Sequence, residues 1–211
     1  MPNQTTSVSQ LYETGNKKFF AASLNADGTF GTKEYHEGLM EVNIEFKTET
    51  TEINADDNLS FIKLNTQVTG EGTIKFAVLP FSVYSKFFDV KIDSNGALVV
   101  KSKTKCKEVA FGYYSSVGDG SESMFTMYKA VFQLPSLAST SFDGKTIRDL
   151  SLSVKVYPFD YINSDNEPDK VTYTILNSNL NSDIWADVQD TIYVPDCSLT
   201  PPPTPPNENG G

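Results

Sequence analysis

The chain has 211 residues, of which 38% are hydrophobic and 12% aromatic, and its 27 acidic residues against 17 basic ones give a formal charge of −10. A chain of this length can bury a substantial core as one domain, and the excess of Tyr and Phe over the single Trp185 favours β structure. No surface-wide basic field exists to hold nucleic-acid phosphates, which argues against specific DNA binding. The densest apolar run, residues 76–81, is too short to cross a bilayer and no signal-peptide pattern is visible, so we expect a soluble protein made in the cytoplasm.

The first part of the chain predicts a polar arm and then alternating strands. Residues 1–10 carry little to bury, and we expect them to be a mobile or docking arm before the apolar group at residues 19–24. Residues 25–29 supply the Asp-Gly turn of a hairpin. The alternation after residue 39 predicts a strand with one apolar and one wet face, the first carrying Met40, Val42, Ile44 and Phe46 and the second Glu41, Asn43, Glu45 and Lys47.

The next stretch predicts a long connection, two strands and one helix. Residues 48–60 are acidic and nearly free of apolar side chains, so we expect a long loop without regular structure. Alternation resumes over residues 61–68, with Lys63, Asn65 and Gln67 on the polar face. Gly70 and Gly72 predict a turn into a strand over residues 73–78. Residues 82–90 have near-helical spacing with a serine to cap them, and they are the only predicted helix.

Residues 105–134 predict the hairpin around which the sheet is built. Two aromatic and β-branched runs flank a cluster of Gly, Ser and Asp at residues 115–123, as in a hairpin with a long loop. The second run is apolar on both faces, with Met124, Tyr128, Ala130, Phe132 and Leu134 on one and Phe125, Met127 and Val131 on the other. A strand of this kind is covered on both sides, so we place it at the centre of the sheet.

The remaining residues complete a mainly β fold. Half-buried strands are predicted at residues 149–156 and 171–175 on either side of a polar loop, residues 160–170, and Trp185 anchors a short final segment. The pattern predicts a β-sandwich or partly closed barrel of antiparallel strands with one flanking α-helix. We expect one domain over residues 1–196, with arms at about 1–18 and about 180–196, and a Pro-rich tail at residues 197–211.

Side chains that carry chemistry are interpreted here as structural. His36, the only histidine, lies in a polar segment and is interpreted as a surface residue. Carboxylates at residues 56–57, 119–122 and 165–169 fit turn chemistry better than a metal or glycosidase site. Three aromatic pairs fit core packing better than stacking on sugars or bases: Phe19–Phe20, Phe87–Phe88 and Tyr113–Tyr114. We predict no enzymatic activity and no catalytic, cofactor or metal site, and the spacing of Cys106 and Cys197 leaves their pairing open.

The order of several segments resembles the major tail (tail tube) proteins of long-tailed, non-contractile phages of Gram-positive bacteria, in particular the phi13-type family. The resemblance extends to about residue 195. The segments that carry it are KKFFAASLNADGTF at residues 17–30, GLMEVNIEF at 38–46, TEINADDN at 51–58, FDVKIDSNGALV at 88–99, EVAFGYYSS at 108–116, MYKAVFQLP at 127–135, FDGKTIRDLSLSV at 142–154 and SDIWADV at 182–188.

The resemblance implies a β-sandwich with a flanking helix whose subunits close into hexameric rings, stacked into a tube that conducts DNA to the host cell. The partners would be further copies of the chain, the tape measure protein in the lumen during assembly, and other tail proteins at the tube ends; DNA would pass without specific binding. The protein would reside in the virion after synthesis in the host cytoplasm. The expected lumen-facing residues are Glu41, Asn43, Glu45, Lys63, Asn65 and Gln67. The expected ring-to-ring contact loop contains Glu49, Glu52, Ile53, Asn54, Asp56 and Asp57.

Two other functional classes remain open. Short strands, exposed loops and a proline-rich tail also fit an immunoglobulin-like or lectin-like binding module on a cell or virion surface. A β-sandwich glycoside hydrolase would need two convergent carboxylates in a groove, and sequence alone does not exclude this.

Both arms, residues 1–10 and those beyond residue 183, are expected to be ordered by neighbouring subunits, because they carry too little apolar surface of their own.

Overall fold

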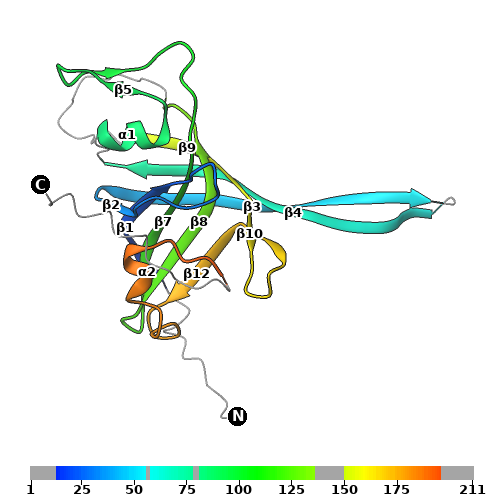
Figure 1. Cartoon of the computed structure of the whole chain (residues 1–211). Coiled ribbons are helices and arrows are strands. Elements are labelled where there is room, and N and C mark those ends of the chain that lie inside the picture. The colour runs from blue at the N-terminus through cyan, green and yellow to red at the C-terminus, as the bar shows by residue number, and fades with distance from the viewer. Residues whose placement is uncertain (1–12, 56–57, 78–80, 136–149, 196–211) are drawn as a thin grey trace, which may run out of the picture.

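The computed structural model describes residues 13–55, 58–77, 81–135 and 150–195 (Figure 1). These residues form antiparallel sheets with two short helices, and the sandwich-like fold is partly open, not a closed barrel. The elements are β1 Glu13–Ser23, β2 Glu34–His36, β3 Leu39–Ala55, β4 Asn58–Phe76, α1 Phe81–Phe87, β5 Lys91–Ile92, β6 Leu98–Val99, β7 Glu108–Val117, β8 Glu122–Phe132, β9 Leu150–Tyr157, β10 Phe159–Ile162, β11 Pro168–Val171, β12 Tyr173–Asn177 and α2 Asp187–Asp190. The predicted mainly β fold is confirmed.

One large sheet organises the described part of the chain. Its strands follow the order β2, β1, β7, β8, β9, β4, β3, and β12 joins it through β8. One edge of β8 pairs with β7, and the other pairs with β12 along residues 123–127 and with β9 along residues 129–132. The predicted hairpin of β7 and β8 therefore lies at the centre of the sheet.

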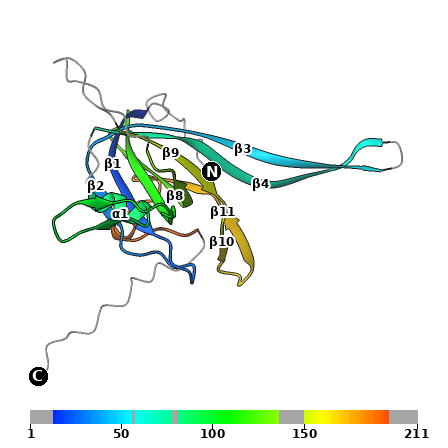
Figure 2. The same ribbon diagram turned by 90° about the horizontal axis from the view of Figure 1, so that it is seen from above.

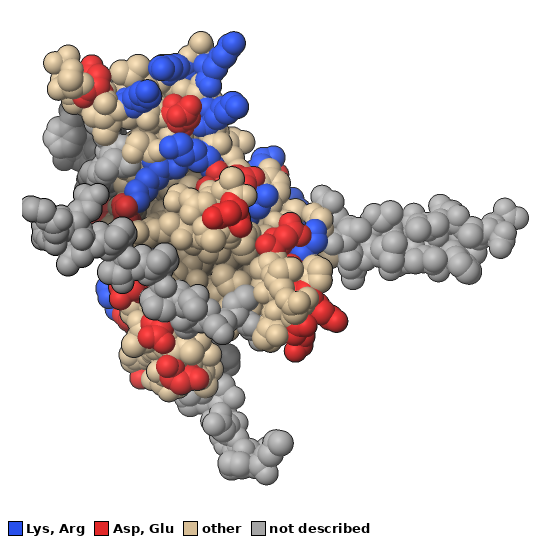
Figure 3. Space-filling model, in the orientation of Figure 1, with Lys and Arg blue, Asp and Glu red and all other residues tan. Residues whose placement is uncertain are grey.

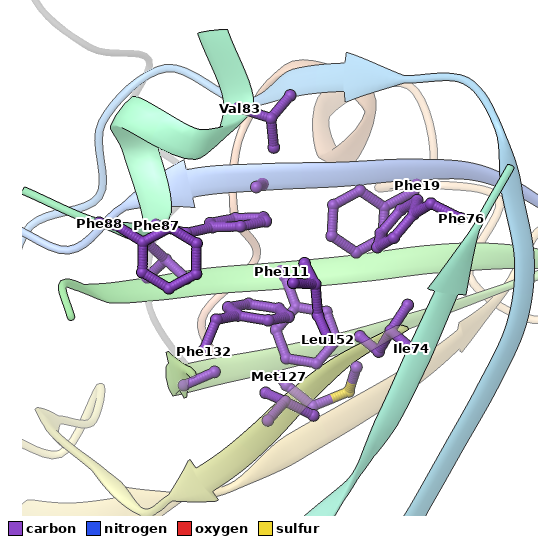
Figure 4. Packing of buried hydrophobic residues seen from close by; sticks show 14 of the residues in the cluster. Phe19, Ile74, Phe76, Val83, Phe87, Phe88, Phe111, Met127, Phe132 and Leu152 are labelled. Atoms are coloured by element: carbon purple, nitrogen blue, oxygen red, sulfur yellow. The ribbon is translucent and has the colours of Figure 1, made fainter. Parts of the chain in front are cut away.

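Both faces of this central hairpin are covered, as predicted. One core cluster lies beneath α1 and contains Phe87, Phe111 and Phe132, with the rings of Phe87 and Phe132 stacked at 4.2 Å (Figure 4). A second cluster on the opposite face contains Tyr114 and Tyr128. Rows of buried aromatic rings on both faces make the centre of the sheet its most deeply enclosed part.

The predicted division of β8 into two faces is wrong in one respect. Tyr128 and Ala130 have the same sequence parity, but Tyr128 packs in the second cluster and Ala130 in the first, together with Met127. The pairing explains this, because Val109 of β7 lies opposite Ala130 whereas Phe111 lies opposite Met127. The extra residue on β8 is a β-bulge, and it shifts the alternation from one face to the other.

The turn predicted at Gly70 and Gly72 is also wrong, because β4 runs through both residues without interruption. A Cβ atom on Gly72 would lie 1.9 Å from the carbonyl oxygen of Asn43, and one on Gly70 would lie 2.8 Å from the ring of Phe46. Glycine is needed here for the close approach of β3 to β4, and not for a reversal of the chain.

The helices and the end of the chain differ partly from the predictions. The predicted helix is present as α1. A second helix, α2, was not predicted. Its Val188, and Ile192 just beyond its end, are both buried in the protein's own second core cluster. Residues 184–195 therefore pack on the core of their own domain, which the low apolar content of this segment did not predict. The polar loop expected at residues 160–170 contains the β10–β11 hairpin.

Candidate functional site

A polar surface, defined here as the outward rows of β3, β4 and β9, crosses one end of the large sheet. The alternation in β3 packs Val42 and Ile44 against the core and leaves the intervening side chains exposed. Met40 departs from this pattern and is 52% exposed, because the pairing of β3 with β4 is irregular between Leu39 and Glu41. The pairing aligns three rows of side chains: Glu41, Lys75 and Ser151; Asn43, Thr73 and Ser153; and Glu45, Glu71 and Lys155.

The charges on the polar surface largely neutralise one another. Lys75 Nζ lies 2.7 Å from the carboxylate of Glu41, and Lys155 Nζ lies 2.9 Å from that of Glu71. The hydrogen bond from Lys155 is the main reason why the pKa of Glu71 is lowered, and it also raises the pKa of Lys155. Exposed pairs of this kind contribute little to stability. These pairs instead reduce the net charge of the polar surface, because each of these two lysines has its own carboxylate partner.

The structure separates the six expected lumen-facing residues into two groups. Glu41, Asn43 and Glu45 are exposed together on the polar surface. Gln67, which is also exposed, lies opposite Glu49 further along the same hairpin, while Asn65 lies opposite Thr50 and Lys63 opposite Glu52. The side chains of Asn65 and Lys63 lie outside the described residues. The strands are neighbours, as predicted, but the two groups follow one another along the hairpin and do not lie side by side.

The expected long loop at residues 48–60 is instead the outer part of a β-ribbon formed by β3 and β4. From here on, 'the arm' means this ribbon and not the terminal segments of the chain. Its backbone continues β3 to Ala55 and resumes as β4 at Asn58, with these two residues paired. β9 pairs with β4 only from Gly70 onward, so within the described residues the arm strands pair with each other alone. Figures 1 and 2 show the ribbon reaching far from the rest of the molecule. Of the expected contact residues, Glu49, Glu52, Ile53 and Asn54 belong to β3, whereas Asp56 and Asp57 lie outside the described residues.

An apolar groove lies where the arm leaves the body. It has a volume of about 350 Å³ and is lined mainly by side chains of β3, β7, β8 and β12. The rings of Phe46 and Tyr173 are 4.5 Å apart, and those of Tyr113 and Phe125 are stacked at 4.8 Å. Ile175 beside them is 53% exposed. Exposed apolar groups gathered in a groove are typical of a contact surface. No local sequence pattern predicts this groove, because its residues come from four separate strands.

A buried lysine joins the body to the final segment. Lys33 is only 6% exposed, and its Nζ donates to the carbonyl oxygen of Val188 at 2.7 Å and lies 3.9 Å from the centre of the Phe20 ring. Burial lowers the pKa of Lys33 to about 7. Beside it, the Tyr35 and Tyr114 hydroxyls lie 3.1 Å apart, and burial raises both tyrosine pKa values. No sequence pattern marked this network, because its members are distant along the chain.

The side chains considered for catalysis have structural surroundings in the described residues. His36 is half-buried in β2, and its pKa is lowered by burial and by the charge of Lys86, so its interpretation as a simple surface residue is wrong. The carboxylate of Asp119 accepts hydrogen bonds from the backbone and hydroxyl of Ser121, which is turn chemistry. Within the described part of the chain, no three His, Cys, Asp or Glu side chains gather to hold a metal. Cys106 is exposed, and Cys197 lies outside the described residues.

The aromatic pairs are used for packing, more fully than predicted. Phe19 and Phe20 are both completely buried, one in each core cluster, because β1 is covered on both faces. Phe87 and Phe88 are also both buried. Tyr114 is buried, and only Tyr113 keeps part of its ring at the surface, in the groove.

Comparison with known proteins gives no assignment, because no family model matches the chain and no curated protein matches it significantly. Among the described residues, no helix is long and apolar enough to span a membrane. The candidate functional features are the three surfaces described above: the polar surface, the arm and the apolar groove.

Proposed function

We propose that this chain is a structural subunit that assembles into stacked hexameric rings, which form the tail tube of a phage and conduct DNA to the host cell. The resemblance to phage tail tube proteins supports this proposal along most of the chain. The structural observation that carries it furthest is the arm, whose strands pair only with each other within the described residues. A two-stranded ribbon without further support is marginally stable in water, so the arm is suited to lie against another molecule. In a tube, that molecule is a subunit of the adjacent ring.

The polar surface is suited to the lumen of such a tube. β3 is an edge strand of the large sheet, and six copies side by side would close their sheets and remove exposed edges of this kind. The two lysines nearest the centre of the polar surface are already paired with carboxylates. DNA phosphates would then meet no excess of positive charge and could slide past. The tape measure protein would occupy this lumen during assembly, and other tail proteins would bind the tube ends.

Negative-stain electron microscopy of the purified full-length protein tests the proposal directly. We expect hollow tubes or rings of uniform diameter, together with a large species in size-exclusion chromatography. A protein that remains a monomer at every concentration, with no rings on the grid, would refute the assembly function. No catalysis is part of the proposed function.

Shortening the arm tests its role separately. The pairing of Thr48 with Val68 allows residues 49–67 to be replaced by Asn-Gly, so that the paired residues flank a two-residue hairpin turn. All the pairing between β4 and β9 lies beyond this cut, so the body should fold normally. We expect the shortened protein to form rings that fail to stack. Long tubes of normal diameter would show that the arm is not the ring-to-ring contact.

The alternative function is an immunoglobulin-like or lectin-like surface binding module. The observation that favours it is the apolar groove, where Tyr113 and Tyr173 keep part of their rings exposed, as in sites that bind flat ligands. This alternative predicts a stable monomer, so the same microscopy and chromatography distinguish the two functions.

A further inference from the structure

Two ends of the body carry an excess of opposite charge, although the protein as a whole is acidic. Residues 86–107, which include β5 and β6, contain six lysines and two aspartates. Residues 159–190, which include β10, β11, β12 and α2, contain seven acidic residues and one lysine. Figure 3 shows lysines gathered over the β5–β6 part of the molecule and carboxylates toward its opposite end. We call these regions the basic end and the acidic end.

Most lysines of the basic end have no carboxylate partner in the described structure. Lys91, Lys101, Lys103 and Lys105 are exposed, and no salt bridge to any of them is found among the described residues. By contrast, four lysines of the large sheet are paired with carboxylates: Lys17, Lys75, Lys129 and Lys155. A group of unpaired like charges repels itself, so it is most stable against a surface of opposite charge.

Exposed apolar side chains accompany the lysines of the basic end. Ile92, Val99 and Val100 are 45%, 38% and 52% exposed. Val99 lies directly opposite Lys91 in the pairing of β5 with β6. Apolar groups surrounded by charged ones are the usual composition of a protein interface, with an apolar centre and a polar rim. The basic end therefore has the composition of a protein contact.

The acidic end has the complementary composition. Ile162 is 54% exposed and lies beside the turn that presents Asp165 and Glu167, whose backbone amides are both held by the Asn163 side chain. Near α2, Leu180 is 77% exposed, and Asp183 is exposed a few residues further on. Each end thus offers apolar side chains among charges that are mostly of one sign.

We propose that the basic end of one copy of this chain binds the acidic end of a second copy, forming a head-to-tail contact. This inference rests on the proposed function, and it names the surfaces that join the subunits. Because the two surfaces differ and lie at opposite ends, the contact repeats in one direction and generates a ring or a filament instead of a closed dimer. It gives the assembly a polarity that the arm alone does not define.

A second copy fits these observations better than nucleic acid does. A DNA duplex would satisfy the basic end but would leave the acidic end without a partner, and it would be repelled by a protein of charge −10. A second copy satisfies both ends at once. The contact between them should weaken as salt is raised, because exposed charges are screened over about 8–10 Å at physiological ionic strength.

Charge reversal with complementation tests the contact. The first variant carries Lys101→Glu, Lys103→Glu and Lys105→Glu, and its matched control carries arginine at the same three positions. These lysine side chains are exposed, so both variants should fold, which circular dichroism and the unfolding temperature would verify.

Two further variants reverse the acidic end in parts. One carries Asp165→Lys and Glu167→Lys on the β10–β11 turn, and the other carries Asp183→Lys and Asp187→Lys near α2. Self-association of each variant, and of equal mixtures with the glutamate variant, is measured by sedimentation velocity at low and high salt, with electron microscopy of the same samples.

We expect the glutamate variant to associate at least about 100-fold more weakly than the wild type, because like charges in contact cost several kcal/mol. The arginine control should associate normally. Mixing the glutamate variant with one of the two lysine variants should restore association, and the variant that restores it identifies the part of the acidic end in contact.

The remaining outcomes separate this inference from the proposed function. Tubes formed equally well by the wild type and the glutamate variant would overturn the head-to-tail contact and leave the tube function standing. Salt-sensitive association without rings or tubes would support the contact and refute the tube. A wild type that stays monomeric at low salt would overturn both. If the wild type binds a DNA duplex through these lysines and no mixture restores association, the partner is nucleic acid and the inference is wrong.

Discussion

Replacing the buried Lys33 by methionine should change how the stability of the protein depends on pH. In the folded protein, burial lowers the pKa of Lys33 from 10.5 to about 7. The unfolded chain keeps its lysine protonated up to its ordinary pKa, so between pH 7 and 10.5 the unfolded state binds more protons than the folded state. The free energy of unfolding therefore rises with pH throughout this window. Methionine has a similar length and no charge, so the variant should lack this rise.

The size of the effect follows from the shift in pKa. A full unit of pH within the window changes the free energy of unfolding by about 1.4 kcal/mol, and less near pH 7, where Lys33 is half-protonated in the folded state. Between pH 7 and pH 9, the wild type should gain about 2 kcal/mol relative to the methionine variant. The tyrosine pKa values near Lys33 are raised, and the pKa of His36 is lowered, so those groups titrate outside this interval.

Urea unfolding at pH 7, 8 and 9 measures the difference, followed by the fluorescence of Trp185, whose ring lies 6.0 Å from that of Tyr114. The matched control is Lys107→Met, because Lys107 also donates to a backbone carbonyl, that of Ser85, but is exposed. This control should follow the wild type at every pH. Equal pH dependence of the wild type and the Lys33 variant would show that Lys33 stays protonated in the folded state, held by the carbonyl of Val188 and the ring of Phe20.

Three further predictions concern packing and surface. Phe132→Ala should lower the free energy of unfolding by about 3–5 kcal/mol, measured by urea unfolding, because the fully buried ring is stacked on Phe87 and its loss leaves a cavity; a loss below 1 kcal/mol would contradict this packing. Gly72→Ala should destabilise the fold strongly, since the added Cβ would lie 1.9 Å from the Asn43 oxygen, and a thermal unfolding curve like that of the wild type would refute this. Ile175→Ser in the apolar groove should change stability by less than about 0.5 kcal/mol but reduce assembly in sedimentation, whereas unchanged assembly would exclude the groove from the contacts.

The elements that could be predicted from the sequence are those whose pattern reflects burial within a single strand. The alternation from Val42 to Lys47 predicts a wet-faced strand, and the dense apolar run around Met127 predicts a strand enclosed on both sides; the structure has both. The bulge in β8 escaped prediction because it depends on the register with β7, and a single-strand pattern carries no information on the partner's register.

The apolar groove and the buried network of Lys33 were harder to predict, because each is assembled from distant residues. The apolar groove joins Phe46 to Tyr173, and the buried network joins Lys33 to Val188, so neither leaves a local pattern. The final segment was expected to depend on neighbours because its apolar residues are few. Burial of Val188 shows that a few well-placed side chains are enough when they pack into the core of the body.

The arm explains why an acidic sequence that looks like a loop can form a strand. Hydrophobic alternation marks a strand most clearly where one face lies on a core. Residues 48–55 of β3 lack this alternation, and they lie in the part of the ribbon where β9 no longer pairs with β4. Its conformation is set by the register that begins in the body, where Ile44 lies opposite Gly72, and continues outward to the pairing of Ala55 with Asn58. A ribbon held in this way needs no apolar face of its own. The segment with the weakest sequence pattern is therefore the one that the proposed function assigns to contact with another subunit.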